Sequence, residues 1–393
     1  RGNRFGMIGM AIAIITTFFL APSPVFVLIV GAMVLGAVVG TWKARTVAMT
    51  QMPETVALMH SLVGLSAVAI ALASVLHTGV EHSTIARFEL FVGCFIGAIT
   101  FSASMFAFGK LAAKSWAKTI KGSWVKPVQA LLFIAMLAFG IMYFTTQSMP
   151  AFYAMTILAI IFGWMWIAPI GGGDMPVVVS LLNSFSGWAA AGIGFTLGNS
   201  MLIIAGSLVG SSGAILSYIM CKAMNRSLLN VLFGGMSSSS AAATEEDTGP
   251  KTYRTGSPED AAFMMENSSS VVIVPGYGMA QGRAQNAVKE LYEMLKEEGV
   301  DVRFAIHPVA GRMPGHMNVL LAEADVPYED ILEMDEINSD FAGTDVVLII
   351  GANDVVNPAA KDDPNSPIFG MPILEANKAQ TVMVIKRSMS AGY

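Results

Sequence analysis

Two glycines in the second half of the chain have the spacing of a nucleotide-binding turn. Gly276 and Gly278 follow the apolar run Val271–Val274 and open a segment with a helical pattern. In a dinucleotide-binding unit the first glycine makes the tight turn, and the second lets a pyrophosphate approach the backbone N–H groups at the helix start. The third glycine position holds Gln281, so the match is partial and an ordinary tight turn is the alternative. The spacing favours a dinucleotide site.

A basic trio follows a later apolar run. Lys386, Arg387 and Ser388 come directly after Thr381–Ile385. An arginine fork and a lysine point charge suit a 2′-phosphate. No acidic residue ends the second expected strand, where an NAD site would hold the ribose 2′-hydroxyl. The pattern therefore favours NADP over NAD, with an ordinary basic strand end as the alternative.

From residue 259 to 393, short apolar runs alternate with helical patterns. This βαβ rhythm predicts an α/β, Rossmann-like domain with a doubly wound parallel sheet that is buried on both faces. We expect one helix from the Gly276 turn to about Glu298, and another at Asn318–Ala324. The expected strands are Val271–Val274, Val302–Ile306, Ile331–Met334, Val346–Ile350 and Thr381–Ile385.

The part of the chain before this domain has the composition of a membrane protein. Up to Asn230 it contains 12 basic and only 4 acidic residues, whereas the remainder contains 11 basic and 24 acidic ones. Charged residues make up 13% of the chain, against about 25% in a soluble protein. A spanning helix needs about 20 mostly apolar residues, and eight stretches qualify as a transmembrane bundle. They lie at about 5–21, 25–42, 54–77, 88–109, 127–146, 151–169, 176–198 and 200–221.

The basic residues of this part predict its orientation. If the N-terminus lies inside, eleven Lys and Arg residues fall in inside segments and only Arg87 falls outside, as the positive-inside rule requires. Eight crossings then return the chain to the cytoplasm, or to a mitochondrial matrix. We divide the chain into a transmembrane domain at 1–230, a flexible linker rich in Gly, Ser and Ala at 231–258, and the nucleotide domain at 259–393. Ser257, followed by Pro258 and Asp260, predicts a helix start.

Polar side chains inside the expected spans are candidates for proton passage, because an unpaired ionisable group is costly in the bilayer. Each also has an ordinary structural explanation. Asp174 can cap a helix start, Asn183 and His60 can bridge two helices, and Glu89 can reach the surface. Gly206, Gly210 and Gly213 have the spacing of close helix packing. The polar candidates are His60, Glu89, Asp174, Asn183, Ser211 and Ser212.

Six segments carry a resemblance to a known family. They are 172–189, 209–227, 275–280, 307–316, 351–354 and 386–388. Through them, and over nearly its whole length, the chain resembles the β subunit of the Re/Si-specific, proton-translocating nicotinamide nucleotide transhydrogenases. The resemblance implies that hydride passes directly from NADH on a partner α subunit to NADP⁺ on this chain, coupled to inward proton movement. It implies a dimer of αβ assemblies in the bacterial inner membrane, with the lipid bilayer but no nucleic acid as a partner.

The resemblance also implies roles for individual residues. The residues that would wrap the nucleotide are Gly276, Tyr277, Gly278, Met279, Ala280, Gly311, Arg312, Met313, Pro314, Gly351, Ala352, Asn353 and Asp354. Lys386, Arg387 and Ser388 would take the 2′-phosphate, and Tyr393 would belong to a loop over the cofactor. Positions tied to proton movement or its coupling are matched by Asp174, Asn183, Ser211, Ser212, Gly213 and Arg226.

Three features depart from the family pattern. Ala86 stands where some members have a membrane histidine, so we expect the relay to use His60 or a histidine of the α subunit. Gln281 and Gly282 replace small apolar residues. The family's first β-subunit helix and the last strand and helix of the nucleotide domain are missing from the sequence, so we expect a longer natural protein and a C-terminally incomplete domain.

Two other classes of protein fit parts of the pattern. A channel or transporter gated by an NADP-sensing domain would need a filter sequence or a basic pore ring, and neither is present. A membrane-anchored dehydrogenase would leave the polar intramembrane residues without a role. No metal site is expected, because Cys94 and Cys221 lie in separate apolar runs and no Cys/His cluster has zinc spacing. A single dinucleotide site cannot transfer hydride between two nucleotides, so a partner must carry the second.

Overall fold

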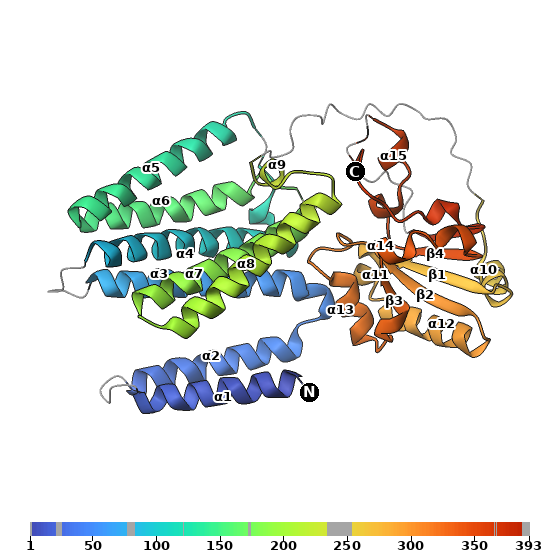
Figure 1. Ribbon diagram of the computed structural model, residues 1–393, viewed down its shortest axis with the longest axis horizontal. Coiled ribbons are helices and arrows are strands. Elements are labelled where there is room, and N and C mark those ends of the chain that lie inside the picture. The colour runs from blue at the N-terminus through green and yellow to red at the C-terminus, as the bar shows by residue number, and fades with distance from the viewer. Residues whose placement is uncertain are drawn as a thin grey trace. The chain divides into compact units, whose positions relative to one another are not determined.

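The computed structural model describes residues 2–20, 26–76, 83–120, 122–171, 174–233, 254–364, 366 and 368–386 (Figure 1). By contacts between its residues, the chain divides into two compact units, Arg1–Met49 and Thr50–Tyr393. Most of the expected linker, residues 234–253, lies outside the described residues, as do Arg387, Ser388 and Tyr393.

The first unit consists of two helices, α1 (Gly2–Leu20) and α2 (Phe26–Thr46). Helix α2 has no buried residue within this unit. A helix that is apolar on all sides is suited to lipid rather than to water, so its exposed apolar residues such as Leu28 are expected in a membrane span. The first expected span falls in α1, where the described apolar stretch, Arg4–Thr16, is shorter than a full crossing.

The second unit begins with six long apolar helices. They are α3 (Met52–Leu76), α4 (Thr84–Leu111), α5 (Val125–Thr146), α6 (Met149–Ile167), α7 (Met175–Thr196) and α8 (Ser200–Ala223). Together with α2, seven helices in the described ranges are long and apolar enough to cross a membrane. A short helix, α9 (Leu228–Phe233), follows α8. The chain is therefore a multi-pass membrane protein, as the composition predicts.

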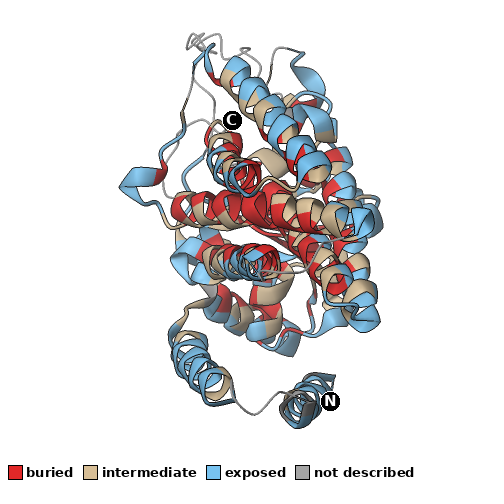
Figure 2. Ribbon diagram, turned by 90° about the vertical axis from the view of Figure 1, so that its left-hand side faces the viewer, coloured by how far each residue is buried: buried red, intermediate tan, exposed pale blue. Residues whose placement is uncertain are grey.

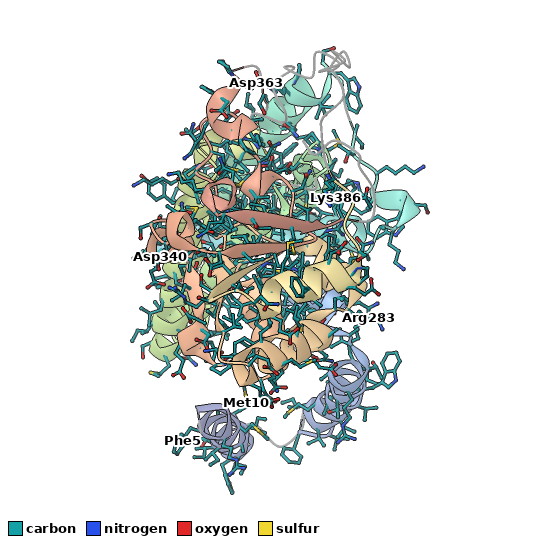
Figure 3. The ribbon with its side chains drawn as sticks, turned by 90° about the vertical axis from the view of Figure 1, so that its right-hand side faces the viewer. Phe5, Met10, Arg283, Asp340, Asp363 and Lys386 are labelled. Carbon is teal, nitrogen blue, oxygen red and sulfur yellow. The ribbon has the colours of Figure 1, made fainter. Side chains whose placement is uncertain are left out.

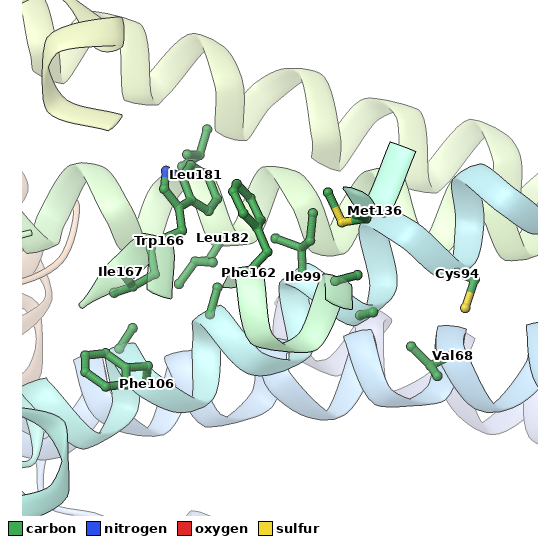
Figure 4. Close-up of a cluster of buried hydrophobic side chains, with 14 of the residues drawn as sticks. Val68, Cys94, Ile99, Phe106, Met136, Phe162, Trp166, Ile167, Leu181 and Leu182 are labelled. Atoms are coloured by element: carbon green, nitrogen blue, oxygen red, sulfur yellow. The ribbon is translucent and has the colours of Figure 1, made fainter. Parts of the chain in front are cut away.

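Helices α4 and α7 are the most buried long helices of this bundle, and Figure 2 shows buried residues gathered in the middle of the second unit. About two thirds of the apolar window of α4 and more than three quarters of that of α7 are buried, against 17% for α5 and 22% for α8. Figure 4 shows apolar side chains from several helices that meet there, including Ile99 of α4, Phe162 of α6 and Leu182 of α7. The outer helices α5 and α8 leave most of their surface exposed.

Glycines allow α7 and α8 to pack backbone to backbone. A Cβ placed on Gly187 of α7 would lie 2.3 Å from the backbone nitrogen of Gly210, and one on Gly206 of α8 would lie 2.5 Å from that of Ala191. No side chain fits in such a space. The structure thus shows the close helix packing that the glycine spacing predicts.

The second unit ends in a five-stranded parallel sheet with the order β3-β2-β1-β4-β5. The strands are β1 (Ser270–Pro275), β2 (Asp301–Ile306), β3 (Ile331–Glu333), β4 (Val346–Ile350) and β5 (Thr381–Ile385). All residues of β4 and all but the first of β1 are buried, as expected for central strands covered on both faces. The five strands and the Rossmann-like class predicted from the sequence are confirmed.

The helices of this domain are α10 (Pro258–Glu266), α11 (Tyr277–Gly282), α12 (Gln285–Glu297), α13 (His316–Glu323), α14 (Met334–Ile337) and α15 (Ala359–Asp362). Short 3₁₀ turns, among them η6 (Asp354–Val356), occupy several connections. Helix α10 starts with the capping box predicted at Ser257 and Asp260.

The single helix predicted from the Gly276 turn to about Glu298 is wrong. Two helices, α11 and α12, occupy this segment, because Arg283 adopts a left-handed conformation with φ of 53°. The N–H groups of Arg283 and Ala284 turn back to the carbonyls of Ala280 and Met279, which closes α11 as a Schellman motif does. The break follows Gly282.

We predict that Gly206→Ala destabilises the helix bundle by about 1–3 kcal/mol, because the new methyl group overpacks the α7–α8 contact. The expected result is a lower midpoint of SDS-induced unfolding in mixed micelles, followed by far-UV circular dichroism. Gly93→Ala is the matched control. Its added Cβ would meet Gly192 only at 3.6 Å, so this variant should keep the wild-type midpoint or exceed it. Equal midpoints for the two variants would contradict the close packing.

Candidate functional site

Two glycine turns meet at the carboxyl edge of the sheet, between its central strands. A Cβ on Gly276, after β1, would lie 2.4 Å from the Cα of Ala352, and one on Gly278 would lie 2.6 Å from that of Gly351. Gly351 follows β4 with φ of +64°, a conformation that favours glycine. From β1 the chain continues to β2 on one side of the sheet, and from β4 it continues to β5 on the other side. Open α/β sheets bind ligands at such a switch point.

The glycine turns bind each other through their backbones. The N–H of Gly276 donates to the carbonyl of Ile350, and that of Gly278 to the carbonyl of Gly351, both at 2.9 Å. These N–H groups are therefore used within the protein. The expectation that Gly278 brings a pyrophosphate to the helix start stays a prediction, and the structure shows a different immediate role for this glycine: it lets the two turns approach.

A cation lies beside the second turn. The Nζ of Lys386, which follows β5, donates to the Oδ1 of Asn353 at 3.1 Å. Figure 3 labels Lys386 and Asp340 at opposite ends of the strands, with Lys386 at the carboxyl end. This places the first member of the expected 2′-phosphate trio next to the expected nucleotide turn; the other two lie outside the described residues.

Arg312 and Tyr277 join the loop after β2 to the turn after β1. The Arg312 guanidinium carbon lies 4.2 Å from the centre of the Tyr277 ring, within the range of a cation–π interaction. His316, at the start of α13 directly after this loop, has its ring 6.3 Å from that of Tyr277. Within the second unit, Arg312 Nη1 also donates to the carbonyl of Leu111 at the end of α4, at 3.3 Å.

The other expected nucleotide residues lie on these same turns. The buried ones are Met279, Ala280, Met313 and Ala352. The less buried ones are Gly311, Pro314 and Asp354.

The edge fits a dinucleotide phosphate. Three glycines leave it without side chains at Gly276, Gly278 and Gly351, and two cations, Arg312 and Lys386, border it. Cations receive phosphates, and the missing side chains leave room for a phosphate to approach the backbone. Sequence reasoning did not select His316, although the segment 307–316 that it closes was singled out.

In the membrane part, Asp174 and Arg226 form an ion pair. The Arg226 Nη1 and the Asp174 Oδ1 are 2.5 Å apart, and the Asp174 side chain is 9% exposed. Asp174 is the N-cap residue of α7, but its side chain makes no capping hydrogen bond. Its carboxylate instead reaches a residue 52 positions away, so the pair ties the start of α7 to the segment after α8.

A second polar contact lies deeper in the bundle. The Ser186 hydroxyl of α7 and the Nδ1 of His60 of α3 are 3.0 Å apart, and the same hydroxyl lies 2.7 Å from the carbonyl of Asn183. Ser186 therefore contacts His60, which lies 126 positions away, and the backbone carbonyl of Asn183 in its own helix.

Not every expected membrane residue joins these contacts. Ser211 and Ser212 are exposed on α8, and the Ser212 hydroxyl donates within its own helix to Val209. Gly213 faces α7, where a Cβ would lie 2.8 Å from the nitrogen of Ser184. Glu89 is half-buried in the second turn of α4.

Lys110 was not predicted as a site residue. Its ammonium, near the end of α4, donates to the carbonyls of Ile167, Ala168 and Ile170 at 3.0, 2.7 and 2.6 Å. A cation is favourable at a helix C-terminus, and all three of its donors are used here. The lysine thereby fixes the connection from α6 toward Asp174. In the sequence it looked like any other inside lysine.

The fold and these contacts define a class: a multi-pass membrane protein that carries a Rossmann-like domain with a phosphate-suited edge. In the described ranges, no group of three His, Cys, Asp or Glu side chains could hold a metal ion.

Comparison with known proteins gives the family. A family model described as the NAD(P) transhydrogenase beta subunit matches residues 1–393. A protein named NAD(P) transhydrogenase subunit beta from Rhodospirillum rubrum is 54% identical over 401 aligned residues, which cover 100% of this chain and 86% of that protein. A second sequence of that name, from a defined strain of the same species, gives the same values. The chain belongs to the NAD(P) transhydrogenase beta subunit family.

We predict that Asp174 and Arg226 stabilise the bundle as a coupled pair. Asp174→Asn and Arg226→Gln should each lower the midpoint of SDS-induced unfolding, because each leaves a partly buried charge without its partner. The double variant should lose less than the sum, with a coupling energy of about 1–3 kcal/mol. Ser74→Ala, whose hydroxyl donates only within α3, combined with Asp174→Asn should be additive. Additivity of Asp174→Asn with Arg226→Gln would contradict the pair.

We also predict that acid weakens the loop after β2. Burial, with a smaller contribution from the Arg312 charge, lowers the pKa of His316 from 6.5 to about 4, and burial lowers the pKa of His307. Between pH 6.5 and 4 the histidines of the unfolded chain bind protons, whereas the buried His316 of the folded chain stays neutral. The free energy of unfolding is therefore at its full value above pH 6.5 and falls as the pH drops through this window.

Hydrogen exchange of residues 301–323, corrected for intrinsic rates, measures this effect. The opening free energy should be lower at pH 5 than at pH 7, and His316→Asn should flatten part of the difference. A pH-independent opening free energy in the wild type would show that the buried imidazoles do not govern the loop.

Proposed function

We propose that this chain binds NADP(H) at the carboxyl edge of its sheet, while an α subunit carries the NAD(H) site. The observation that supports this most is the meeting of the Gly276–Gly278 and Gly351 turns at the β1–β4 switch point, bordered by Lys386. NADP(H), when bound, would supply the nicotinamide ring that exchanges hydride. The relatives' names and the beta-subunit family support both the reaction and the α partner.

The role of this chain's residues follows from that proposal. Lys386 would attract the 2′-phosphate, and Asn353 would orient the lysine. Arg312, stacked on Tyr277, would hold the loop after β2 close to the turn after β1. Arg387, Ser388 and Tyr393 complete the proposed site. In this proposal the assembly is a Re/Si-specific enzyme, a dimer of αβ units, in a bacterial inner membrane with the nucleotide domain in the cytoplasm.

Proton movement would drive the reaction, because the two nucleotides have nearly equal reduction potentials. Each charge that crosses 100 mV contributes about 2.3 kcal/mol. The contact of His60 with Ser186, and of Ser186 with the carbonyl of Asn183, is the polar line that we propose for the proton. Asp174 and Arg226, at the end of the bundle that continues toward the nucleotide domain, would couple protonation to NADP(H) affinity. Glu89, Ser211, Ser212 and Gly213 remain candidates for the same pathway.

The defining experiment uses the full-length subunit with its α partner in proteoliposomes. Reduction of an NADP⁺ analogue by NADH is measured together with lumenal pH. Hydride transfer that changes lumenal pH, and whose rate changes when the gradient is collapsed, is the expected result. NADP binding with NADP-dependent ion flux but without hydride transfer would instead identify a gated channel.

We predict that Asn183→Leu uncouples the two processes, because it removes the side-chain amide from the proposed proton pathway while it keeps the backbone carbonyl that accepts from Ser186. Hydride transfer should persist while its response to the proton gradient falls at least about tenfold, the effect of removing about 1.4 kcal/mol of coupling. The matched control is Ser74→Ala on α3, which should behave as the wild type. Full coupling in Asn183→Leu would reduce Asn183 to a packing residue.

A further inference from the structure

We propose that His316 is the positioning residue of the loop Gly311–Pro314, which its neutral imidazole holds in place beside Tyr277. This inference rests on the proposed function, since it assigns a task to the loop that would border NADP(H). The task is to keep the loop in the shape that accepts the nucleotide, without contact between His316 and the reacting atoms.

The hydrogen bonds of His316 define its tautomer. The N–H of Arg312 donates to its Nδ1 at 3.1 Å, so Nδ1 must carry a lone pair. A neutral imidazole then holds its proton on Nε2. The residue is 1% exposed, and Nε2 has no partner within the described part of the protein. The ring is thus committed to accepting one backbone N–H from the loop.

The loop is shaped around this ring. Gly311 has φ of +106°, and a Cβ on it would lie 2.6 Å from both the Cβ and the Nδ1 of His316. Only a glycine can therefore approach the ring so closely. The N–H of His316 in turn donates to the carbonyl of Met313 at 3.2 Å, so the two central residues of the loop, Arg312 and Met313, are both attached to His316.

The same ring links the loop to the nucleotide turn. It lies 6.3 Å from the Tyr277 ring, on which the Arg312 guanidinium stacks at 4.2 Å. If the imidazole lost its acceptor, the Arg312 backbone would be released, and its side chain would no longer be held over Tyr277. The hydrogen bond from the Arg312 N–H to His316 thereby determines the position of the Arg312 guanidinium over Tyr277.

The charged groups around His316 favour the neutral ring. Arg312 is the nearest charge and repels a proton on the imidazole. The carboxylate of Glu333, which lines the same cavity of about 170 Å³ as His316, accepts a hydrogen bond from Asn318 at 3.3 Å.

The test compares two substitutions at this position in the full-length subunit. Asparagine can place its Oδ1 where the histidine has Nδ1, whereas leucine cannot accept a hydrogen bond. Binding of NADP⁺ is measured by isothermal titration calorimetry in detergent, and KM and kcat are measured with the α partner. His316→Leu should weaken NADP⁺ binding about five- to tenfold, as expected for the loss of one hydrogen bond, and raise KM with little change in kcat. His316→Asn should stay within about twofold of the wild type.

A merely structural histidine would give a different pattern, because both substitutions would then weaken binding equally or not at all, and either result overturns the proposal. If His316→Leu does not fold, Gly311→Ala tests the same contact from the loop side, and it should weaken NADP⁺ binding with retained kcat. Wild-type affinity in that variant would also overturn the proposal. A wild-type chain that binds no NADP⁺ would instead refute the proposed function itself.

Discussion

Close approach of two backbones at glycine positions is the constraint on which both parts of the second unit depend. In the membrane part, Gly187 and Gly206 bring α7 and α8 into direct contact. In the sheet domain, Gly276, Gly278 and Gly351 bring two turns together at the edge that we assign to the nucleotide. In both places a single added methyl group would force the two backbones apart. The close approach of the helices and of the turns therefore depends on the absence of side chains at these glycines.

Two charged groups of the bundle, Lys110 and Asp174, have partners that fix helix ends. Lipid offers no hydrogen bonds, so each buried polar group needs a protein partner. Lys110 binds the last carbonyl of α6 and two carbonyls directly after it, and Asp174 pairs with Arg226 beyond α8. The connection between α6 and α7 is therefore held at both of its ends. A change in the charge of Asp174 would act directly on this connection.

A reaction outside the membrane can depend on protons inside it only through conformation. The loop that carries Arg312 and the helix end at Leu111 share a hydrogen bond, and Arg312 also stacks on Tyr277 beside the proposed nucleotide turn. A change at the helix ends and a change at the nucleotide can thus act on the same side chain. This is the kind of shared element that thermodynamic coupling between two sites requires.

The sequence by itself determined the elements: the apolar lengths of the spans, the five strands, the Ser257 helix start and the glycine spacing all act locally, through periodicity and backbone freedom. It did not determine which distant groups meet. Helix α11 ends where Arg283 turns left-handed, a residue type that gives no such signal. The partners of Asp174, His60 and Lys110 lie 52 to 126 positions away, and a sequence carries no local record of such contacts. Only the tertiary structure decided them, because they arise from the packing of whole helices.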